Sequence, residues 1–226
     1  MLRSMSLTGR VKLGLAVAGI ALGVAAPYIF DRFVIGLISL ALIGGLFAQS
    51  IDLLGGYAGL ITLGHAGVSG TAAYGVGYMA AKVGAGFPAQ IAVGFLAGMV
   101  AALIFGVMAM RSDGVYFIMV TLAQGMIVWG LSIRLFRITG AENGLTGIPR
   151  PPGVDLYWQY YYLTFAVVVL CWGLLGIVVN SPFGTSLKGL RESETRMRML
   201  GYNTTGQKLY VFLISGFFAT VSGILL

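Results

Sequence analysis

Two ionisable side chains lie close together in an apolar part of the sequence. Asp52 follows a long apolar run, and His65, the single histidine of the chain, comes thirteen residues later. Ionisable groups within membrane segments are rare and are functional candidates by default. Two other interpretations stay open: Asp52 as an acid at the membrane interface, and His65 as a hydrogen-bonding residue between helices. One histidine cannot build a multi-histidine metal site, so we expect no metal and no cofactor.

Ser69 lies in a short motif that could carry a nucleophile. The stretch Gly67–Gly70 resembles the nucleophile motif of rhomboid intramembrane proteases, in which a histidine on another helix activates the serine. Here the single histidine is only four residues upstream of Ser69, so a second helix cannot supply the base. The sequence also has no Walker A pattern for nucleotide hydrolysis. We therefore expect no enzymatic activity.

The composition is that of a membrane protein. Of the 226 residues, 58% are hydrophobic and 9% are charged, whereas a soluble domain carries roughly 25% charged residues. Fourteen lysines and arginines stand against seven acids, which indicates basic cytoplasmic loops and not nucleic-acid binding. The 35 glycines favour close helix packing. Gly94 and Gly98 have the four-residue spacing of a packing face.

Seven apolar runs are the candidate membrane helices. They cover residues 12–30, 33–54, 66–81, 90–110, 114–133, 159–179 and 209–226. At about 20 residues per crossing, they predict an all-α bundle of about seven spans that forms a single domain, 1–226. The third run is short and follows a glycine-rich stretch, so we expect a broken or re-entrant helix near 52–70. Such backbone must be buried in protein or line a cavity.

The distribution of basic residues predicts the orientation. With the N-terminus in the cytoplasm, nine of the fourteen basic residues are inside and five are outside. The loop 181–208 is then cytoplasmic, and the loop 134–158 lies on the far side. The last run ends at Leu226 without an interfacial anchor, so we expect the chain to be truncated at its C-terminus.

The loop 181–208 contains an amphipathic pattern. Its apolar residues share one face of a predicted helix, and its charged residues surround the rest. The apolar residues are Leu187, Leu190, Met197 and Leu200; Arg191 and Glu192 are among the charged ones, and Gly201 ends the helix. A helix of this kind can rest on the lipid surface or fit a groove on a soluble partner. Helix physics alone favours the lipid surface.

Four groups of motifs occur in order along the chain. They are Gly56-Tyr57-Ala58-Gly59 with Leu63-Gly64-His65-Ala66 and Ala73-Tyr74; Gly114-Val115-Tyr116-Phe117 with Thr121-Leu122-Ala123; Asn143-Gly144-Leu145-Thr146-Gly147-Ile148-Pro149; and Phe183-Gly184, Arg191-Glu192 and Leu200-Gly201. Together they resemble the M-type permease of branched-chain amino acid ABC importers, over residues 52–223. Three departures from that family are Leu60, where a glutamine is frequent, Thr62, where a serine is frequent, and Arg196-Met197, which replaces a common pair of alanines.

The resemblance implies a multi-pass permease subunit in a bacterial inner membrane, importing leucine, isoleucine, valine or similar amino acids. It implies a second, homologous permease, two ATPase subunits and a periplasmic substrate-binding protein as partners, besides the lipid bilayer. It also implies that the segment 187–201 is a coupling helix that docks on an ATPase and does not rest on the lipid surface.

The resemblance implies two further groups of site residues. The translocation path would contain Tyr57, Gly59, Leu63, Gly64 and His65, and a periplasmic loop would contain Asn143, Gly144 and Thr146. The rival hypothesis is an ion-coupled secondary transporter or a channel. Such proteins usually need intramembrane carboxylates or an unwound ion site, and only Asp52 and His65 qualify here.

Overall fold

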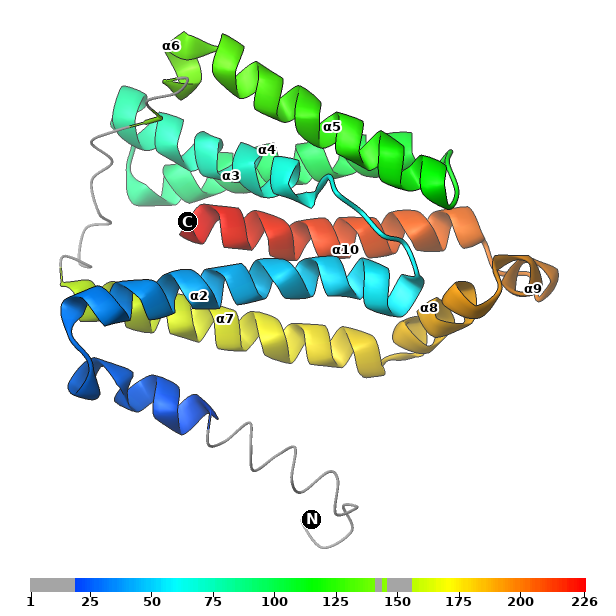
Figure 1. Ribbon diagram of the computed structural model, residues 1–226, viewed down its shortest axis with the longest axis horizontal. Helices are drawn as coiled ribbons and strands as arrows, with labels where there is room; N and C mark the ends of the chain where they lie inside the picture. The colour runs from blue at the N-terminus through cyan, green and yellow to red at the C-terminus, as the bar shows by residue number, and fades with distance from the viewer. Residues whose placement is uncertain (1–18, 141–143, 146–155) are drawn as a thin grey trace, which may run out of the picture.

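The structure is a computed structural model that describes residues 19–140, 144–145 and 156–226 (Figure 1). This part of the chain is helical and contains no strand. Its elements are α2 (Arg32–Asp52), η2 (Leu53–Ala58), α3 (His65–Tyr78), η3 (Met79–Val83), α4 (Phe87–Ala109), α5 (Val115–Arg134), α6 (Phe136–Thr139), α7 (Tyr157–Asn180), α8 (Pro182–Glu192), α9 (Glu194–Met199) and α10 (Thr204–Leu225). The predicted all-α class is confirmed for these residues.

The predicted count of about seven spans is not confirmed. Among the described residues, five helices are long and apolar enough to cross a membrane: Arg32–Ala58, α4, α5, α7 and α10. The first predicted run corresponds to a shorter apolar helix, Gly19–Ile29, and the rest of that run lies outside the described residues. The third run forms α3 and part of the π-helical η3 that follows it, and the backbone before α3, 59–64, is not helical.

Helix α10 is the centre of the bundle. It is the most buried of the five spans and packs against α2, α3 and α4 (Figure 1). A Cβ atom on Gly94 of α4 would meet Ala72 and Val76 of α3, and one on Gly98 would meet Thr220 of α10. Close contact of this kind holds helices together in lipid, where burial of apolar surface gives no driving force. The predicted packing face of α4 is therefore confirmed.

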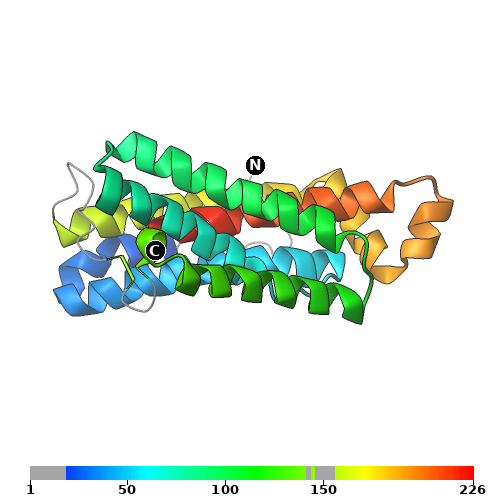
Figure 2. The ribbon, with the colours of Figure 1, turned by 90° about the horizontal axis from the view of Figure 1, so that it is seen from above.

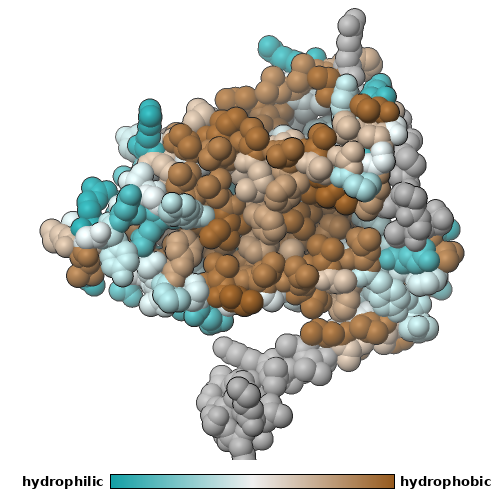
Figure 3. All heavy atoms as spheres, turned by 180° about the vertical axis from the view of Figure 1, so that it is seen from behind, coloured by the Kyte–Doolittle hydropathy of each residue, from teal (hydrophilic) through white to brown (hydrophobic). Residues whose placement is uncertain are grey.

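The surface divides into a hydrophobic belt and two more hydrophilic ends (Figure 3). Helices α8 and α9 project beyond the spans at one end (Figure 2). The turn between α4 and α5 and the connection from α2 to α3 lie at the same end, because residues of both contact α8, α9 or the start of α10. This end is called the α8–α9 end below. The loop that is expected in the cytoplasm thus lies beside two other connections of the bundle, the α4–α5 turn and the α2–α3 connection.

Candidate translocation and coupling site

The expected break near 52–70 is present. Helix α2 continues as the π-helical turn η2, and the chain reverses at Gly59, whose φ is 74°. The next residues are not helical, and Leu60, Thr62 and Gly64 are buried whereas Ile61 and Leu63 are exposed. Alternation with a period of two is the expected pattern of extended backbone. This break segment, residues 59–64, then leads into α3 at His65.

The break segment is held by hydrogen bonds to side chains. The Leu63 N–H donates to Thr121 Oγ1 of α5 at 3.2 Å, and the Gly64 N–H donates to Thr62 Oγ1 at 3.3 Å. The Leu60 N–H donates to the Leu54 carbonyl at 2.9 Å. An unpaired N–H in a membrane interior would cost several kcal/mol. The two threonines therefore replace bonds that a continuous helix would supply.

Gly64 is where the break segment comes closest to α5. A Cβ atom on this residue would lie 2.8 Å from the Thr121 carbonyl oxygen. Real Cβ atoms do not approach a backbone oxygen so closely, so a larger residue would push the segment away from Thr121. Gly64 is buried and allows the break segment to pack directly against α5.

His65 joins three parts of the bundle. Its Nε2 lies 2.7 Å from Ser215 Oγ of α10, and its Nδ1 lies 3.2 Å from Thr62 Oγ1. Ser215 Oγ in turn donates to the Ser50 carbonyl of α2. This direction leaves Ser215 Oγ to accept from Nε2–H, and in the neutral tautomer that carries its proton on Nε2, Nδ1 accepts from Thr62. We call His65, Thr62, Ser215 and Ser50 the histidine cluster.

The histidine cluster has the residues of a serine–histidine pair but not its chemistry. The serine is Ser215 of α10, not Ser69 of the protease-like motif, which lies one turn along α3 from His65. Both His65 and Ser215 are completely buried, and the Ser215 proton is donated to a carbonyl oxygen. A nucleophile must give its proton to the base. The geometry therefore supports the hydrogen-bonding interpretation of His65.

Helix α8 touches the turn that precedes the break segment. Arg191 Nη1 donates to the Gly56 carbonyl at 2.5 Å, and a Cβ atom on Gly59 would meet the Arg191 side chain. Lys188 Nζ lies 5.8 Å from the centre of the Tyr57 ring. The structure thus brings Arg191, expected in the coupling helix, against Gly59 and the Tyr57 turn, expected in the translocation path. Sequence spacing did not predict this contact.

The predicted single coupling helix over 187–201 is wrong, because the segment forms two helices. Ser193 is extended between them, with φ −164° and ψ 104°, and its Oγ accepts from the Arg196 N–H as the N-cap of α9. Gly201 ends α9 as predicted, with φ 84°. The Tyr202 N–H donates to the Met197 carbonyl, which completes a Schellman motif.

The division at Ser193 separates the predicted apolar face. Leu187, Leu190 and Met197 are buried against the rest of the chain, whereas Leu200 is 67% exposed. Met199 and Tyr202 are exposed beside Leu200 at the end of the bundle. This exposed group, Met199, Leu200 and Tyr202, is called the α9 tip below. Glu192, the last residue of α8, is exposed as well.

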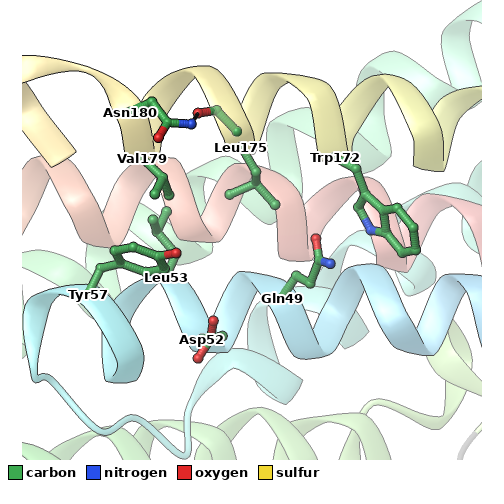
Figure 4. A pocket seen from close by; sticks show the side chains of 9 residues that line it. Gln49, Asp52, Leu53, Tyr57, Trp172, Leu175, Val179 and Asn180 are labelled. Carbon is green, nitrogen blue, oxygen red and sulfur yellow. Dashed lines mark hydrogen bonds between the residues drawn. The ribbon is translucent and has the colours of Figure 1, made fainter. Parts of the chain in front are cut away.

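Two cavities adjoin the expected translocation residues. A cavity of about 370 Å³ between α2 and α7 is lined by Gln49, Asp52, Leu53, Tyr57, Trp172, Leu175, Gly176, Val179 and Asn180 (Figure 4). A second, of about 360 Å³, lies between α3 and α5 and includes Leu63. Tyr57 and Leu63 therefore line different cavities, while Gly64 and His65 are buried.

The expected periplasmic loop is described only in part. Gly144 has φ 64° and packs against Gly140, where a Cβ atom would meet its backbone. Asn143 and Thr146 lie outside the described residues. In the part of the chain that the structure describes, no group of three or more histidine, cysteine or acidic side chains is arranged to hold a metal ion.

Comparison with known proteins gives the family. A family model described as the permease component of the branched-chain amino acid transport system matches residues 33–226. The high-affinity branched-chain amino acid transport system permease protein LivM of Escherichia coli (strain K12) is 28% identical over 236 residues, covering 92% of this chain and 56% of that protein. LivM of Salmonella typhimurium is 27% identical over 233 residues, covering 91% and 55%. None of the solved structures matches the chain.

The chain spans just over half the length of these curated relatives. Both relatives are named as permease proteins and not as enzymes. The family match includes the break segment, the histidine cluster, α8 and α9. The resemblance to M-type permeases is thereby confirmed, and the chain belongs to the family of branched-chain amino acid transport system permeases.

Proposed function

We propose that this chain is one permease half of an ATP-driven importer for branched-chain or similar small amphipathic amino acids. One observation carries the proposal beyond family membership: α8 contacts the turn before the break segment, through Arg191 and the Gly56 carbonyl. A subunit that moves α8 would therefore act on a discontinuity inside the bundle. This is the connection that an importer driven from its surface requires.

The partners that suit this function are a homologous permease, two ATPase subunits and a periplasmic substrate-binding protein in a bacterial inner membrane. The α9 tip is the surface proposed to dock on an ATPase, because Met199 and Leu200 expose large apolar side chains beyond the spans. Arg196 is exposed on α9 and adds positive charge near the tip, whereas Arg198 is paired with Glu194. A groove with an apolar floor and acidic rim would complement it.

Of the two cavities, the one between α2 and α7 suits an amino acid better as part of the translocation path. Its volume of about 370 Å³ is within the usual range for small-molecule sites, roughly 300–1,000 Å³. Asp52, Gln49 and Asn180 supply polar groups, and Leu175 and Val179 supply an apolar wall. The carboxylate of Asp52 suits an ammonium group, and the wall suits an aliphatic side chain. The cavity between α3 and α5 is mostly apolar, and its lining contains no charged side chain.

The proposed mechanism starts at the α9 tip. Closure of the ATPase pair would displace α8 and α9, and Arg191 would transmit this movement to the turn at Gly56. Gly59, with its positive φ, provides a hinge at the start of the break segment. The histidine cluster would keep the other end of the segment fixed to α2 and α10. Tyr57 and Asp52 would then change the shape of the cavity between α2 and α7.

A charged residue at the α9 tip is expected to prevent ATPase docking. Leu200→Asp or Met199→Asp places a carboxylate in an apolar contact, so co-purification of the ATPase subunits with the permease should be lost. Leu156→Asp is the matched control, because Leu156 is exposed at the opposite end and occupies an N-cap, where aspartate is favoured. Undiminished ATPase binding by both tip variants would contradict the docking proposal.

Loss of the Asp52 charge is expected to weaken uptake without preventing assembly. Asp52→Asn removes the proposed partner of the substrate ammonium group, which should raise the KM for leucine uptake about tenfold. Uptake is measured in liposomes that contain the complete transporter. Asp31→Asn is the control, since Asp31 is at the N-cap of α2 and its side chain makes no capping hydrogen bond that the change would remove. An unchanged KM for Asp52→Asn would contradict the proposed ammonium site at Asp52.

His65 is expected to act through its hydrogen bonds. His65→Gln keeps a donor for Ser215 and should retain most uptake, whereas His65→Leu leaves buried polar groups unpaired at about 1–3 kcal/mol each and should abolish it. Ser69→Ala should be silent. The measurement is leucine uptake across a range of pH. If uptake by the wild type depends on pH and this dependence disappears in His65→Gln, the ion-coupled rival is favoured.

The proposed orientation places the N-terminus and the α8–α9 end in the cytoplasm. Single cysteines introduced as Thr195→Cys in α9 and Lys82→Cys in η3 lie at opposite ends of the bundle, and the background variant Cys171→Ala removes the one native thiol. An impermeant maleimide should label position 82 in intact spheroplasts and position 195 only after permeabilisation. The reverse pattern would invert the topology.

A further inference from the structure

A buried lysine of α10 links this helix to α9 and to the turn between α4 and α5. Lys208 lies in the second turn of α10, and its side chain is only 6% exposed. Its Nζ lies 2.5 Å from Asp113 Oδ1 and 2.6 Å from Glu194 Oε2. A buried ammonium group is costly unless it is paired. The two nearby carboxylates therefore compensate the charge of Lys208.

The two carboxylates belong to parts of the chain that are otherwise separate. Asp113 is in the turn between α4 and α5, and Glu194 is the first residue of α9. Glu194 also accepts a hydrogen bond from Arg198 at 3.0 Å. Burial raises the pKa of Glu194, but the hydrogen bond and the charge of Lys208 outweigh this and lower it overall. Glu194 is therefore a carboxylate at neutral pH.

Helix α9 has few other attachments. It contains six residues, of which only Met197 is buried. The extended Ser193 separates it from α8, and the turn at Gly201 separates it from α10. The polar links of α9 to α10 run through Glu194, which pairs with Lys208 and hydrogen-bonds to Thr204. The same short helix leads directly into the exposed α9 tip.

We propose that Lys208 is a positioning residue that transmits displacement of α9 to α10 and to the α4–α5 turn. The inference rests on the proposed function, because it supplies the second route by which a docked ATPase would act on the bundle. Ser215 of the histidine cluster follows Lys208 by seven residues on the same helix, about 10 Å along the axis. A displacement of Lys208 along α10 would therefore reach the end of the break segment, whereas Arg191 reaches its beginning.

The test uses the complete transporter and compares uptake with ATP hydrolysis. Lys208→Met removes the charge but keeps an apolar side chain of similar length; Asp113 is 73% exposed, and Glu194 keeps its ion pair with Arg198. The ATPase subunits should still co-purify and hydrolyse ATP, while leucine taken up per ATP falls about tenfold. Lys208→Arg should retain coupling. Lys82→Met, an exposed lysine of η3 at the other end, is the matched control.

A double variant separates the ion pair from general damage. Glu194→Gln alone should lower uptake per ATP, and Glu194→Gln combined with Lys208→Met should be no worse than Lys208→Met alone, because both remove the same interaction. Additive losses would overturn the proposal. An unchanged uptake per ATP in Lys208→Met would overturn it too.

A second measurement is independent of the partners. Amide hydrogen exchange in the purified chain should become faster over residues 194–200 in Lys208→Met and stay unchanged in Lys82→Met. Equal exchange in the wild type and Lys208→Met would show that the ion pair does not hold α9. Faster exchange together with failure of the wild type to bind any ATPase would instead refute the proposed function and leave the ion pair as a structural anchor.

Discussion

The need to hydrogen-bond a non-helical backbone inside a membrane bundle governs the centre of this structure. A helix satisfies its own N–H groups, but the break segment, 59–64, cannot. Thr121 and Thr62 accept from this backbone, and Thr62 is bonded in turn to His65. His65 then depends on Ser215, and Ser215 on the Ser50 carbonyl. The helices α2, α3, α5 and α10 are consequently tied together at the break.

This arrangement would hold the discontinuity at one end and let it move at the other. Its far end is fixed by buried hydrogen bonds, which are costly to break. Its near end reverses at Gly59 beside α8, where Arg191 makes one hydrogen bond, to the Gly56 carbonyl. Displacement at the surface would therefore change the near end first. The cavity between α2 and α7 includes Tyr57 from this near end, so its shape would change with it.

Much of the fold could be predicted from the sequence, because apolar runs and glycines carry local information. The break after Asp52 and the helix end at Gly201 followed from residue types alone. The division of the coupling segment was missed, although Ser193 is a favoured N-cap residue and was itself the available signal. One continuous helix through Met197 and Leu200 fitted the sequence as well as two helices do. The two residues differ only in tertiary burial, since Met197 is buried and Leu200 is exposed.

The interactions that organise the candidate site could not be predicted in the same way. Ser215 lies 150 residues from His65, and Asp113 lies 95 residues from Lys208. No periodicity connects positions so far apart, and a serine in an apolar span is compatible with many partners. The available signal was only that Ser215 and Lys208 are among the polar residues of a mostly apolar helix. Which residues they meet is decided by the packing of α10.

The central claim is that the histidine cluster holds the break segment in one hydrogen-bonded conformation. Amide hydrogen exchange over residues 59–65 of the purified protein tests it most directly, with the exposed turn 111–114 as an internal reference. The account predicts protection similar to that of α3 in the wild type, and a marked loss of protection in Ser215→Ala. Exchange as fast as that of the turn in the wild type, or unchanged protection in Ser215→Ala, would contradict it.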